Sequence, residues 1–287
     1  AGSSGLVTAK YARDAGHEVS IVEATGDIGG TFVNKAYKDG RMVSSKYLSC
    51  FSDFRRPDAE THMSLSDYVV YLREYAAHFG LKEMIRFNLK VLHVQKSTGL
   101  SGAYEVTLAE AEDARPFVEA WDAVAICSGL HNVPRIPSFP GQEQFTGTIL
   151  HSCDYKDPKI FMGRQVLIIG SGETAFDLGY AAASHGAKSV TMSTRHGFVS
   201  VPSAFGENNP PLDCVIMNWA THAWESRWAQ RVGMHWWVTT KFTRLGFLLT
   251  TGCSYGFNQW VGRRYNMTWH DGRKHIVNKS SRSACRY

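Results

Sequence analysis

The chain has 287 residues, of which 44% are hydrophobic, and it carries a formal net charge of +5. This composition excludes wholesale disorder and leaves room for more than one packed domain. The basic residues are scattered rather than clustered, which suits an anionic small ligand such as a nucleotide and argues against a nucleic-acid surface.

Six cysteines are spread along the chain, at positions 50, 127, 153, 214, 253 and 285. No two of them form a Cys-x-x-Cys pair, and none pairs with a histidine at the spacing of a zinc site, so we expect free thiols and no metal. Free thiols are typical of a reducing compartment, and no apolar run is long enough to span a membrane. We therefore expect a cytoplasmic protein.

Residues 1–23 are predicted to form a glycine turn, a helix and a strand. Gly2 and Gly5 precede apolar residues at helical spacing, and residues 17–23 alternate before turning apolar. This order is the turn-helix-strand part of a dinucleotide-binding unit, in which glycines let the backbone approach a pyrophosphate at the helix N-terminus. Glu23 ends the strand at the spacing where an acid accepts hydrogen bonds from ribose hydroxyls. An ordinary glycine turn with a surface glutamate is the alternative.

The next stretch, GDIGGTF at residues 26–32, predicts a second close approach of the backbone to the same ligand. A plain loop is the alternative. Together the two stretches give a candidate nucleotide site, and its acidic strand end favours FAD. The residues of this site are Gly2, Ser4, Gly5, Glu23, Gly29, Gly30 and Thr31.

Residues 165–195 repeat the pattern with a strand in front. Residues 166–170 predict a buried strand and residues 189–193 a second one; the helix between them has Ala175, Leu178, Ala181 and Ala182 on one side. The candidate site residues in the turn and the start of the helix are Gly170, Ser171, Gly172, Glu173 and Thr174. Arg195 stands where the first unit has Glu23, and arginine pairs with a 2′-phosphate, so this site favours NADP over NAD. A surface arginine near a loop is the alternative.

Between the two units, residues 120–129 end a predicted strand, and three prolines follow before residue 141. We therefore predict an α/β protein with two Rossmann-like, doubly wound dinucleotide-binding domains. Residues 1–140 would form the N-terminal part of an FAD-binding domain, residues 141–163 an interdomain linker, and residues 164–287 part of an NADPH-binding domain. Because the chain opens on the glycine turn and ends without a closing element, we expect a fragment that lacks the first strand and the C-terminal part, with the FAD domain incomplete.

This combination resembles the flavin-containing monooxygenases of the dimethylaniline monooxygenase type. Residues 1–23 resemble their FAD fingerprint, GDIGGTF their Ile-Gly-Gly-Thr motif, and SSKYLSCFSDF at residues 44–54 their Ser-Lys…Cys-Phe-Ser-Asp-Phe stretch. The most specific match is to their identifying sequence F-x-G-x-x-x-H-x-x-x-Y/F, carried here by Phe145, Gly147, His151 and Tyr155. Baeyer–Villiger monooxygenases end that motif with Trp-Pro, whereas here it ends with Tyr155-Lys156.

The resemblance implies that this linker motif joins the two nucleotide domains. Gly147 would permit a tight turn, Phe145 and Tyr155 would anchor the segment by burying their rings, and His151 would link backbone segments by hydrogen bonds. We interpret the motif as holding FAD and NADPH in register rather than as a catalytic base.

The resemblance also implies the chemistry. NADPH passes a hydride to FAD, the reduced flavin and oxygen give a C4a-hydroperoxyflavin, and a nucleophilic nitrogen or sulfur of a small molecule is oxygenated. The expected cofactors are FAD and NADPH, the expected partners are oxygen and a small-molecule substrate, and no nucleic acid is expected. The alternatives are a Baeyer–Villiger or N-hydroxylating flavin monooxygenase and a truncated, non-catalytic nucleotide-binding fragment. A disulfide reductase with two such domains would need a redox cysteine pair, which the sequence does not show.

One position departs from the family pattern. The family commonly has Asn in a Phe-Met-His-Asn-Ser stretch associated with the flavin and oxygen site, whereas the corresponding piece here is His62-Met63-Ser64-Leu65-Ser66. Leu65 takes the place of the Asn, which predicts leakage to hydrogen peroxide unless a polar neighbour such as Ser64 substitutes. No catalytic residue is assigned.

The C-terminal third holds seven of the eight tryptophans, at positions 219, 224, 228, 236, 237, 260 and 269. Trp224 and Trp228 would share one helix face. We favour core packing for these rings, with a membrane-surface helix and a wall of a substrate channel as alternatives, so membrane association is left open.

Overall fold

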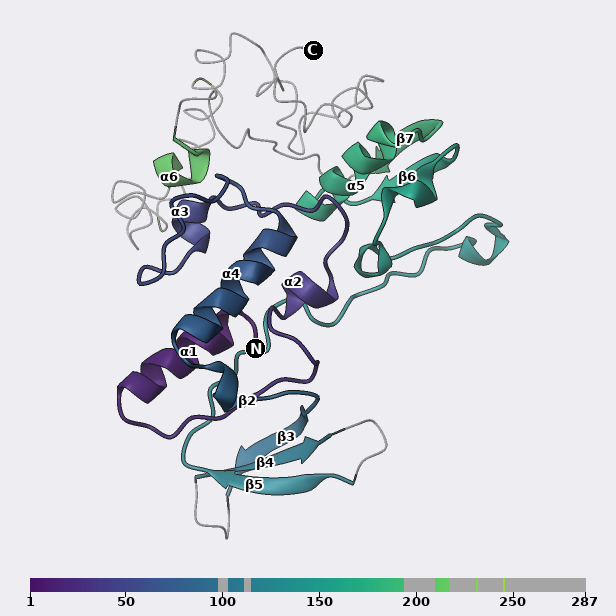
Figure 1. The fold of residues 1–287 in the computed structure, drawn as a ribbon. Helices are drawn as coiled ribbons and strands as arrows, with labels where there is room; N and C mark the ends of the chain where they lie inside the picture. Colours follow the sequence, from purple (N-terminus) through teal and green to yellow (C-terminus); the bar gives the residue numbers. More distant parts are fainter. Residues whose placement is uncertain (98–102, 111–114, 194–209, 217–230, 232–244, 246–287) are drawn as a thin grey trace. The chain divides into compact units, whose positions relative to one another are not determined.

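Residues 1–97, 103–110, 115–193 and 210–216, with Arg231 and Leu245, are described by the computed structural model in Figure 1. They belong to two compact units. The first combines Ala1–Asp39 with Met63–Asp154, and the second combines Gly40–His62 with the described part of Tyr155–Tyr287. The predicted domain limits at residues 140 and 163 stay a prediction, and the tryptophan-rich stretch lies outside the described residues.

The first unit opens with helix α1, Ser3–Asp14, as the apolar spacing predicts, and the helix buries Leu6 and Ala9. The strand predicted over residues 17–23 forms only as β1, Ile21–Val22. It pairs in parallel with β2, Ile85–Arg86. The strand is short because β2 offers it only these two residues.

Helix α4, Leu65–His78, contributes one apolar face to the core of the first unit. Its buried side chains recur at helical spacing: Tyr68, Val69, Tyr71, Leu72, Tyr75 and Ala76. Helix α1 lies beside it (Figure 1), since the Arg13 guanidinium donates to the carbonyl oxygen of Phe79 just beyond α4. The short helix α2, Thr31–Asn34, packs on α4 through the ring of Phe32, which meets the ring of Tyr68 edge-on at 4.8 Å between centroids.

A three-stranded antiparallel sheet completes the first unit. It runs in the order β3, Lys90–Lys96, β4, Tyr104–Ala109, and β5, Phe117–Trp121. Val106 and Leu108 of β4 are buried together with Leu89. Three single-turn 3₁₀ helices also belong here: Lys82–Met84, Gln142–Gln144 and Ser152–Asp154. The prediction of a strand that ends at residue 129 is wrong, because residues 123–129 pair with no described strand.

The second unit contains a parallel strand-helix-strand motif. Strand β6, Gln165–Ile169, pairs with β7, Ser189–Ser193, and helix α5, Glu173–Ser184, connects them. This confirms the predicted order and is the βαβ unit of a Rossmann-like fold. Helix α5 covers one face of the strand pair. On the other face Leu167 of β6 is 62% exposed, so the prediction of a buried strand holds for one face only.

The buried stripe of α5 also differs from the prediction. It consists of Phe176, Gly179 and Ala182, so of the four predicted inner residues only Ala182 is fully buried. The other elements described in the unit are the helices α3, Lys46–Ser49, and α6, Leu212–Ile216, and the 3₁₀ turn Pro158–Phe161. Within the described ranges, no helix has the length and apolar character needed to cross a lipid bilayer.

Candidate functional site: two glycine-capped helix N-termini

The glycines of the first unit bring two backbone segments into contact at the start of α1. Gly30 has a left-handed φ of 55°, and a Cβ atom built on it would lie 3.3 Å from Cα of Gly2. The N–H of Gly29 donates to the carbonyl oxygen of Ala1 at 3.0 Å, and a Cβ on Gly29 would lie 2.6 Å from a methyl group of Val33. Only glycine fits this approach without displacement of backbone or packed side chains.

The N-terminus of α1 is not closed by any side chain. Gly2 is its N-cap residue and supplies no capping oxygen, and Ser4 is exposed on the first turn. The first-turn N–H groups, together with the positive end of the helix dipole, therefore form an arrangement that receives an anion such as a pyrophosphate. Thr31, also exposed, begins α2 directly after Gly30.

Glu23 follows β1 as a half-buried carboxylate. Its Oε1 accepts hydrogen bonds from the Thr25 N–H at 2.9 Å and from the Thr25 hydroxyl at 2.8 Å. Burial acts to raise the pKa of Glu23, and these hydrogen bonds act to lower it. The side chain is thus an ionised hydrogen-bond acceptor at neutral pH.

Two contacts that the sequence did not predict support the glycine segments around the start of α1, here called the cradle. The Asp27 carboxylate accepts from the Ile28 N–H at 2.7 Å and pairs with the Arg73 guanidinium of α4, and the hydrogen bond from Arg73 is the largest cause of the lowered pKa of Asp27. A Cβ on Gly5 would lie 3.7 Å from Cβ of Cys127, so the chain after β5 returns to the first turn of α1. These pairs are 46 and 122 residues apart in sequence, and no short-range pattern signals them.

The second glycine turn, in the second unit, joins β6 to α5. Gly170 has a φ of 122° and donates its N–H to the carbonyl oxygen of Ser193 at 2.9 Å. Gly172 is the N-cap of α5, again without a capping side chain, and a Cβ on either glycine would meet no atom within 4 Å. Ser171 lies between these glycines, and Glu173 and Thr174 begin the helix. Arg195, the predicted selector for a 2′-phosphate, lies outside the described residues.

Both turns fit a dinucleotide. In the first turn, glycines bring no side chain that would block the start of α1. In the second turn, a Cβ on Gly170 or Gly172 would meet no atom, so the space in front of α5 is open. Each helix begins without a side-chain cap, which leaves its N–H groups for a phosphate. In the described part of the chain, no three His, Cys, Asp or Glu side chains are grouped to hold a metal, and Cys50, Cys127, Cys153 and Cys214 are free thiols.

The residues of the linker motif differ in their surroundings. In the first unit, Phe145 is 60% exposed rather than buried, and its ring covers Gly147, where a Cβ would lie 2.5 Å from the ring. His151 Nδ1 accepts from the N–H of Cys153 at 3.2 Å and lies 3.0 Å from its Sγ. In the second unit, Tyr155 is 1% exposed and stacks on the ring of Phe161 at 5.3 Å.

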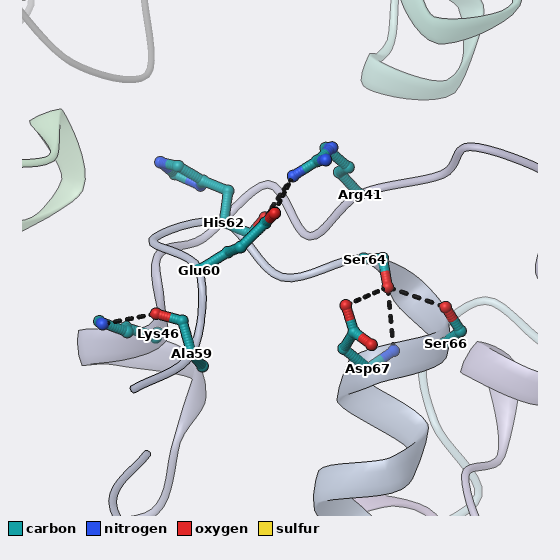
Figure 2. Close-up of polar contacts among 8 residues, drawn as sticks. All are labelled: Arg41, Lys46, Ala59, Glu60, His62, Ser64, Ser66 and Asp67. Carbon is teal, nitrogen blue, oxygen red and sulfur yellow. Dashed lines mark hydrogen bonds and ion pairs between the residues drawn. The ribbon is translucent and has the colours of Figure 1, made fainter. Parts of the chain in front are cut away.

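Ser64 is used by the helix that it begins. Figure 2 shows its hydroxyl accepting from the Asp67 N–H at 3.0 Å, donating to the Asp67 carboxylate at 2.6 Å and lying 2.8 Å from the Ser66 hydroxyl. This is a helix N-cap, and Leu65 is the first residue of α4 and brings no polar group. The Ser64 hydroxyl is therefore already engaged in capping, which argues against its replacing the Asn of the family pattern.

The stretch at residues 44–54 lies in the second unit, where polar contacts link it and its flanks at residues 41 and 59–62. The Lys46 ammonium donates to the carbonyl oxygen of Ala59 at 2.6 Å, and Arg41 pairs with Glu60 and donates to the carbonyl oxygen of His62 at 3.0 Å (Figure 2). Burial raises the pKa of the Cys50 thiol, so this cysteine is a packed side chain rather than a reactive thiolate.

The profile of the flavin-binding monooxygenase-like family matches residues 1–245, which include both glycine turns and the linker motif. The chain belongs to this family. Flavin-binding monooxygenases of this kind use FAD and NADPH. The monooxygenase cfoE of Aspergillus candidus is 33% identical to the chain, over 98% of the chain and 50% of the relative. The dimethylaniline monooxygenase 2 (N-oxide-forming) of Cavia porcellus is 38% identical, over 75% of the chain and 42% of the relative.

Solved structures share the fold. S-allyl-L-cysteine S-oxygenase from Allium sativum is 25% identical with a TM-score of 0.61, over 74% of this chain and 53% of that one. OTEMO in complex with FAD and NADP is 23% identical with a TM-score of 0.58, over 77% of this chain and 41% of that one. The α/β, Rossmann-like architecture is thereby confirmed. The chain spans about half the length of the curated relatives it matches.

Proposed function

We propose that the protein is an FAD- and NADPH-dependent monooxygenase that oxygenates a nucleophilic nitrogen or sulfur of a small molecule. The observation that carries the proposal is the close approach of Gly30 to Gly2 at the uncapped start of α1, in a chain of the flavin-binding monooxygenase-like family. Relatives named for N-oxide formation and a structural neighbour named for S-oxygenation support the substrate class.

In this proposal the glycines around the start of α1, here called the first glycine cluster, hold FAD. The N–H groups of α1 receive the pyrophosphate, Gly2, Ser4, Gly5, Gly29, Gly30 and Thr31 line its path, and Glu23 accepts from ribose hydroxyls. Glu23 suits this role because Thr25 holds its carboxylate in place. The linker motif, Phe145, Gly147, His151 and Tyr155, keeps its expected role of joining the two nucleotide domains.

The second glycine turn would hold NADPH. The N–H groups of α5 receive the pyrophosphate beside Gly170, Ser171 and Gly172, with Glu173 and Thr174 in the first turn. Arg195 pairs with the 2′-phosphate, a role that rests on its place two residues after β7. Bound NADPH and FAD supply the hydride and the oxygen chemistry, and the chain's part is to bind, orient and shield them. Oxygen and a small molecule are the partners in this proposal; the location in the cytoplasm and any attachment to a membrane stay predictions.

The test is an absorption spectrum of the purified chain followed by product analysis with NADPH and oxygen. A tertiary amine, a thioether and a cyclic ketone serve as the three probes. The proposal expects bound flavin, and an N-oxide or a sulfoxide as product. A lactone from the ketone would favour the Baeyer–Villiger alternative, against which Tyr155-Lys156 argues. A colourless chain that binds no added FAD would favour the non-catalytic nucleotide-binding alternative.

A further inference from the structure

Lys35 fastens a distant segment to the FAD cradle. It directly follows α2, and its ammonium donates to the carbonyl oxygens of His131 at 2.9 Å and of Asn132 at 2.5 Å. The side-chain amide of Asn132 in turn donates to the carbonyl oxygen of Ser128. Residues 128–132, here called the 128–132 segment, are thus folded on themselves and tied to the end of α2.

The position of this tie is next to the proposed pyrophosphate site. The 128–132 segment begins directly after Cys127, whose Cβ lies 3.7 Å from the Cβ position of Gly5 and whose Sγ lies 3.8 Å from the Thr8 hydroxyl of α1. Lys35 itself comes shortly after Gly30, which touches Gly2. The ammonium therefore joins the two chain segments that meet at the first turns of α1.

Apolar packing does not hold the 128–132 segment in the described part of the chain. Leu130 is 94% exposed and the neighbouring Val133 is 90% exposed. Gly129, with a φ of 83°, makes the bend. Since the side chains of this stretch face water, the polar contacts of Lys35 and Asn132 are what fasten it.

The charge of Lys35 also reaches the linker motif. Burial and the carboxylate of Asp154 raise the pKa of Cys153, and the ammonium of Lys35 opposes them.

We propose that Lys35 is a positioning residue for FAD: it latches the 128–132 segment beside the N-terminus of α1 and slows the escape of the dinucleotide. The inference rests on the proposed function, because it requires FAD in the first glycine cluster. In this proposal Lys35 acts through the 128–132 segment, to whose carbonyl oxygens it donates, and not as a ligand of FAD.

The test compares Lys35→Met and Lys35→Arg with the control Lys90→Met, which removes an exposed lysine of β3 in the same unit. FAD dissociation from the full chain is followed by the recovery of flavin fluorescence, and amide hydrogen exchange of residues 128–133 is measured in the FAD-free chain. Lys35→Met is expected to release FAD about tenfold faster, as loss of charge-assisted hydrogen bonds predicts, and to speed exchange in the segment. Lys35→Arg, which can still donate to both carbonyl oxygens, and Lys90→Met are expected to stay near the parent chain.

The outcomes separate the latch from the proposed function. If the parent chain binds no FAD, the proposed function fails, and unchanged exchange in Lys35→Met would overturn the latch independently. If the parent chain binds FAD and Lys35→Met releases it at the same rate, the latch is overturned, whatever the exchange shows. Where Lys35→Met does not fold, Lys35→Gln, whose neutral and shorter side chain loses the charge-assisted contacts, replaces it under the same criteria. Asn132→Ala is a further control, because it removes only the hydrogen bond to Ser128 and leaves both carbonyl acceptors of Lys35, so its FAD release is expected to change less than that of Lys35→Met.

Discussion

Gly30 and Gly16 both have a positive φ but differ in what surrounds them. Their φ angles are 55° and 89°. A Cβ on Gly30 would meet the backbone of Gly2 at 3.3 Å, whereas a Cβ on Gly16 would meet no atom within 4 Å. Gly16 is therefore required only by its backbone conformation, while Gly30 is required by its conformation and by the approach of a second backbone segment.

Alanine at these two glycines separates the two requirements. Gly16→Ala is expected to lower the free energy of unfolding by about 1–2 kcal/mol, the cost of a left-handed conformation for a residue with a Cβ. Gly30→Ala would place a Cβ at φ 55° and ψ −125°, a conformation that essentially only glycine adopts and that costs about 1–3 kcal/mol, and it also pushes the loop away from Gly2, so FAD binding is expected to weaken by about tenfold or more. Urea unfolding and flavin fluorescence titration of both variants measure this. Equal loss of FAD affinity in the two variants would refute a role for the Gly2–Gly30 contact.

Gly172 presents the opposite case, because its conformation suits any residue. Its φ of −79° and ψ of 173° are ordinary extended values, and its Cβ position is open. Gly172→Val is therefore expected to change the free energy of unfolding by about 1 kcal/mol or less, the scale of a changed N-cap. It should nevertheless weaken NADPH binding strongly, because the branched side chain would occupy the space in front of α5. Calorimetric titration with NADPH checks this, with Gly172→Ala as an intermediate; unchanged affinity in the valine variant would contradict the site.

At the scale of elements, the three long helices of the described ranges begin in two different ways. α4 is closed by Ser64, whose hydroxyl accepts from the N–H of Asp67, while α1 and α5 begin at Gly2 and Gly172 without a capping side chain. A capped helix has already satisfied part of its N-terminal donors, and an uncapped one has not. The helices proposed to bind cofactors are thus the two that leave these donors to a ligand or to water.

Removal of the α4 cap tests whether Ser64 is structural. Ser64→Ala is expected to cost about 1 kcal/mol in the free energy of unfolding, because the N–H of Asp67 loses its acceptor. The hydrogen peroxide released per NADPH consumed should stay the same, since the hydroxyl is engaged in the cap. Ser66→Ala, whose hydroxyl is exposed, is the control and should change stability by about 0.5 kcal/mol or less. A rise in peroxide release without loss of stability would show instead that Ser64 serves the oxygen site.

The elements that could be predicted are those whose signal lies within one short stretch. Residues 165–193 fold as expected because an apolar strand, a glycine turn and a periodic helix follow each other directly. Strands that depend on a partner could not be predicted in the same way: residues 17–23 pair only at Ile21–Val22, and residues 123–129 do not pair in the described structure. Helix α4 could also have been predicted. Ser64 stands three residues before Asp67, as in an N-cap, and apolar residues follow at helical spacing.

The candidate site divides in the same way. The glycines and Glu23 could be named from spacing, because the dinucleotide fingerprint is local. The residues that hold the cradle together could not, because Arg73 reaches Asp27 and Lys35 reaches His131 across 46 and 96 residues. Such pairs depend on the folded path of the chain, for which a single sequence carries no periodic signal.

At the scale of the whole molecule, each compact unit is built from two separate stretches of sequence. In the second unit, residues 40–62 join a part of the chain that begins more than ninety residues later. Hydrogen bonds of Ser45, a fully buried residue, tie these stretches: its N–H donates to the Asp213 carboxylate of α6 at 2.6 Å, and its hydroxyl lies 3.6 Å from the Cys214 Sγ. The Cys214 N–H donates to the other oxygen of the same carboxylate at 2.8 Å.

Asp213→Ala is expected to loosen the second unit at this tie. The Ser45 N–H would be left buried without its acceptor, which costs about 1–3 kcal/mol in the free energy of unfolding. Asp213→Asn is the matched control, because it keeps an oxygen to accept the hydrogen bond while it removes the charge. Urea unfolding followed by tryptophan fluorescence measures both variants. Equal stability of Asp213→Ala and the parent chain would mean that Ser45 finds another acceptor and that α6 does not secure residues 40–62.

The same tie should depend on pH. Burial acts to raise the pKa of Asp213, but the hydrogen bonds from Ser45 and Cys214 outweigh it and place the pKa below its usual value of 3.8. A carboxylate with a lowered pKa in the folded state stabilises that state fully at pH values above 3.8 and loses this contribution as the pH falls through the lowered pKa. The parent chain should therefore exceed Asp213→Asn in stability by more at pH 7 than at pH 3. A difference that does not shrink on acidification would show that the charge of Asp213 contributes nothing to the tie, and that the acceptor oxygen alone secures Ser45.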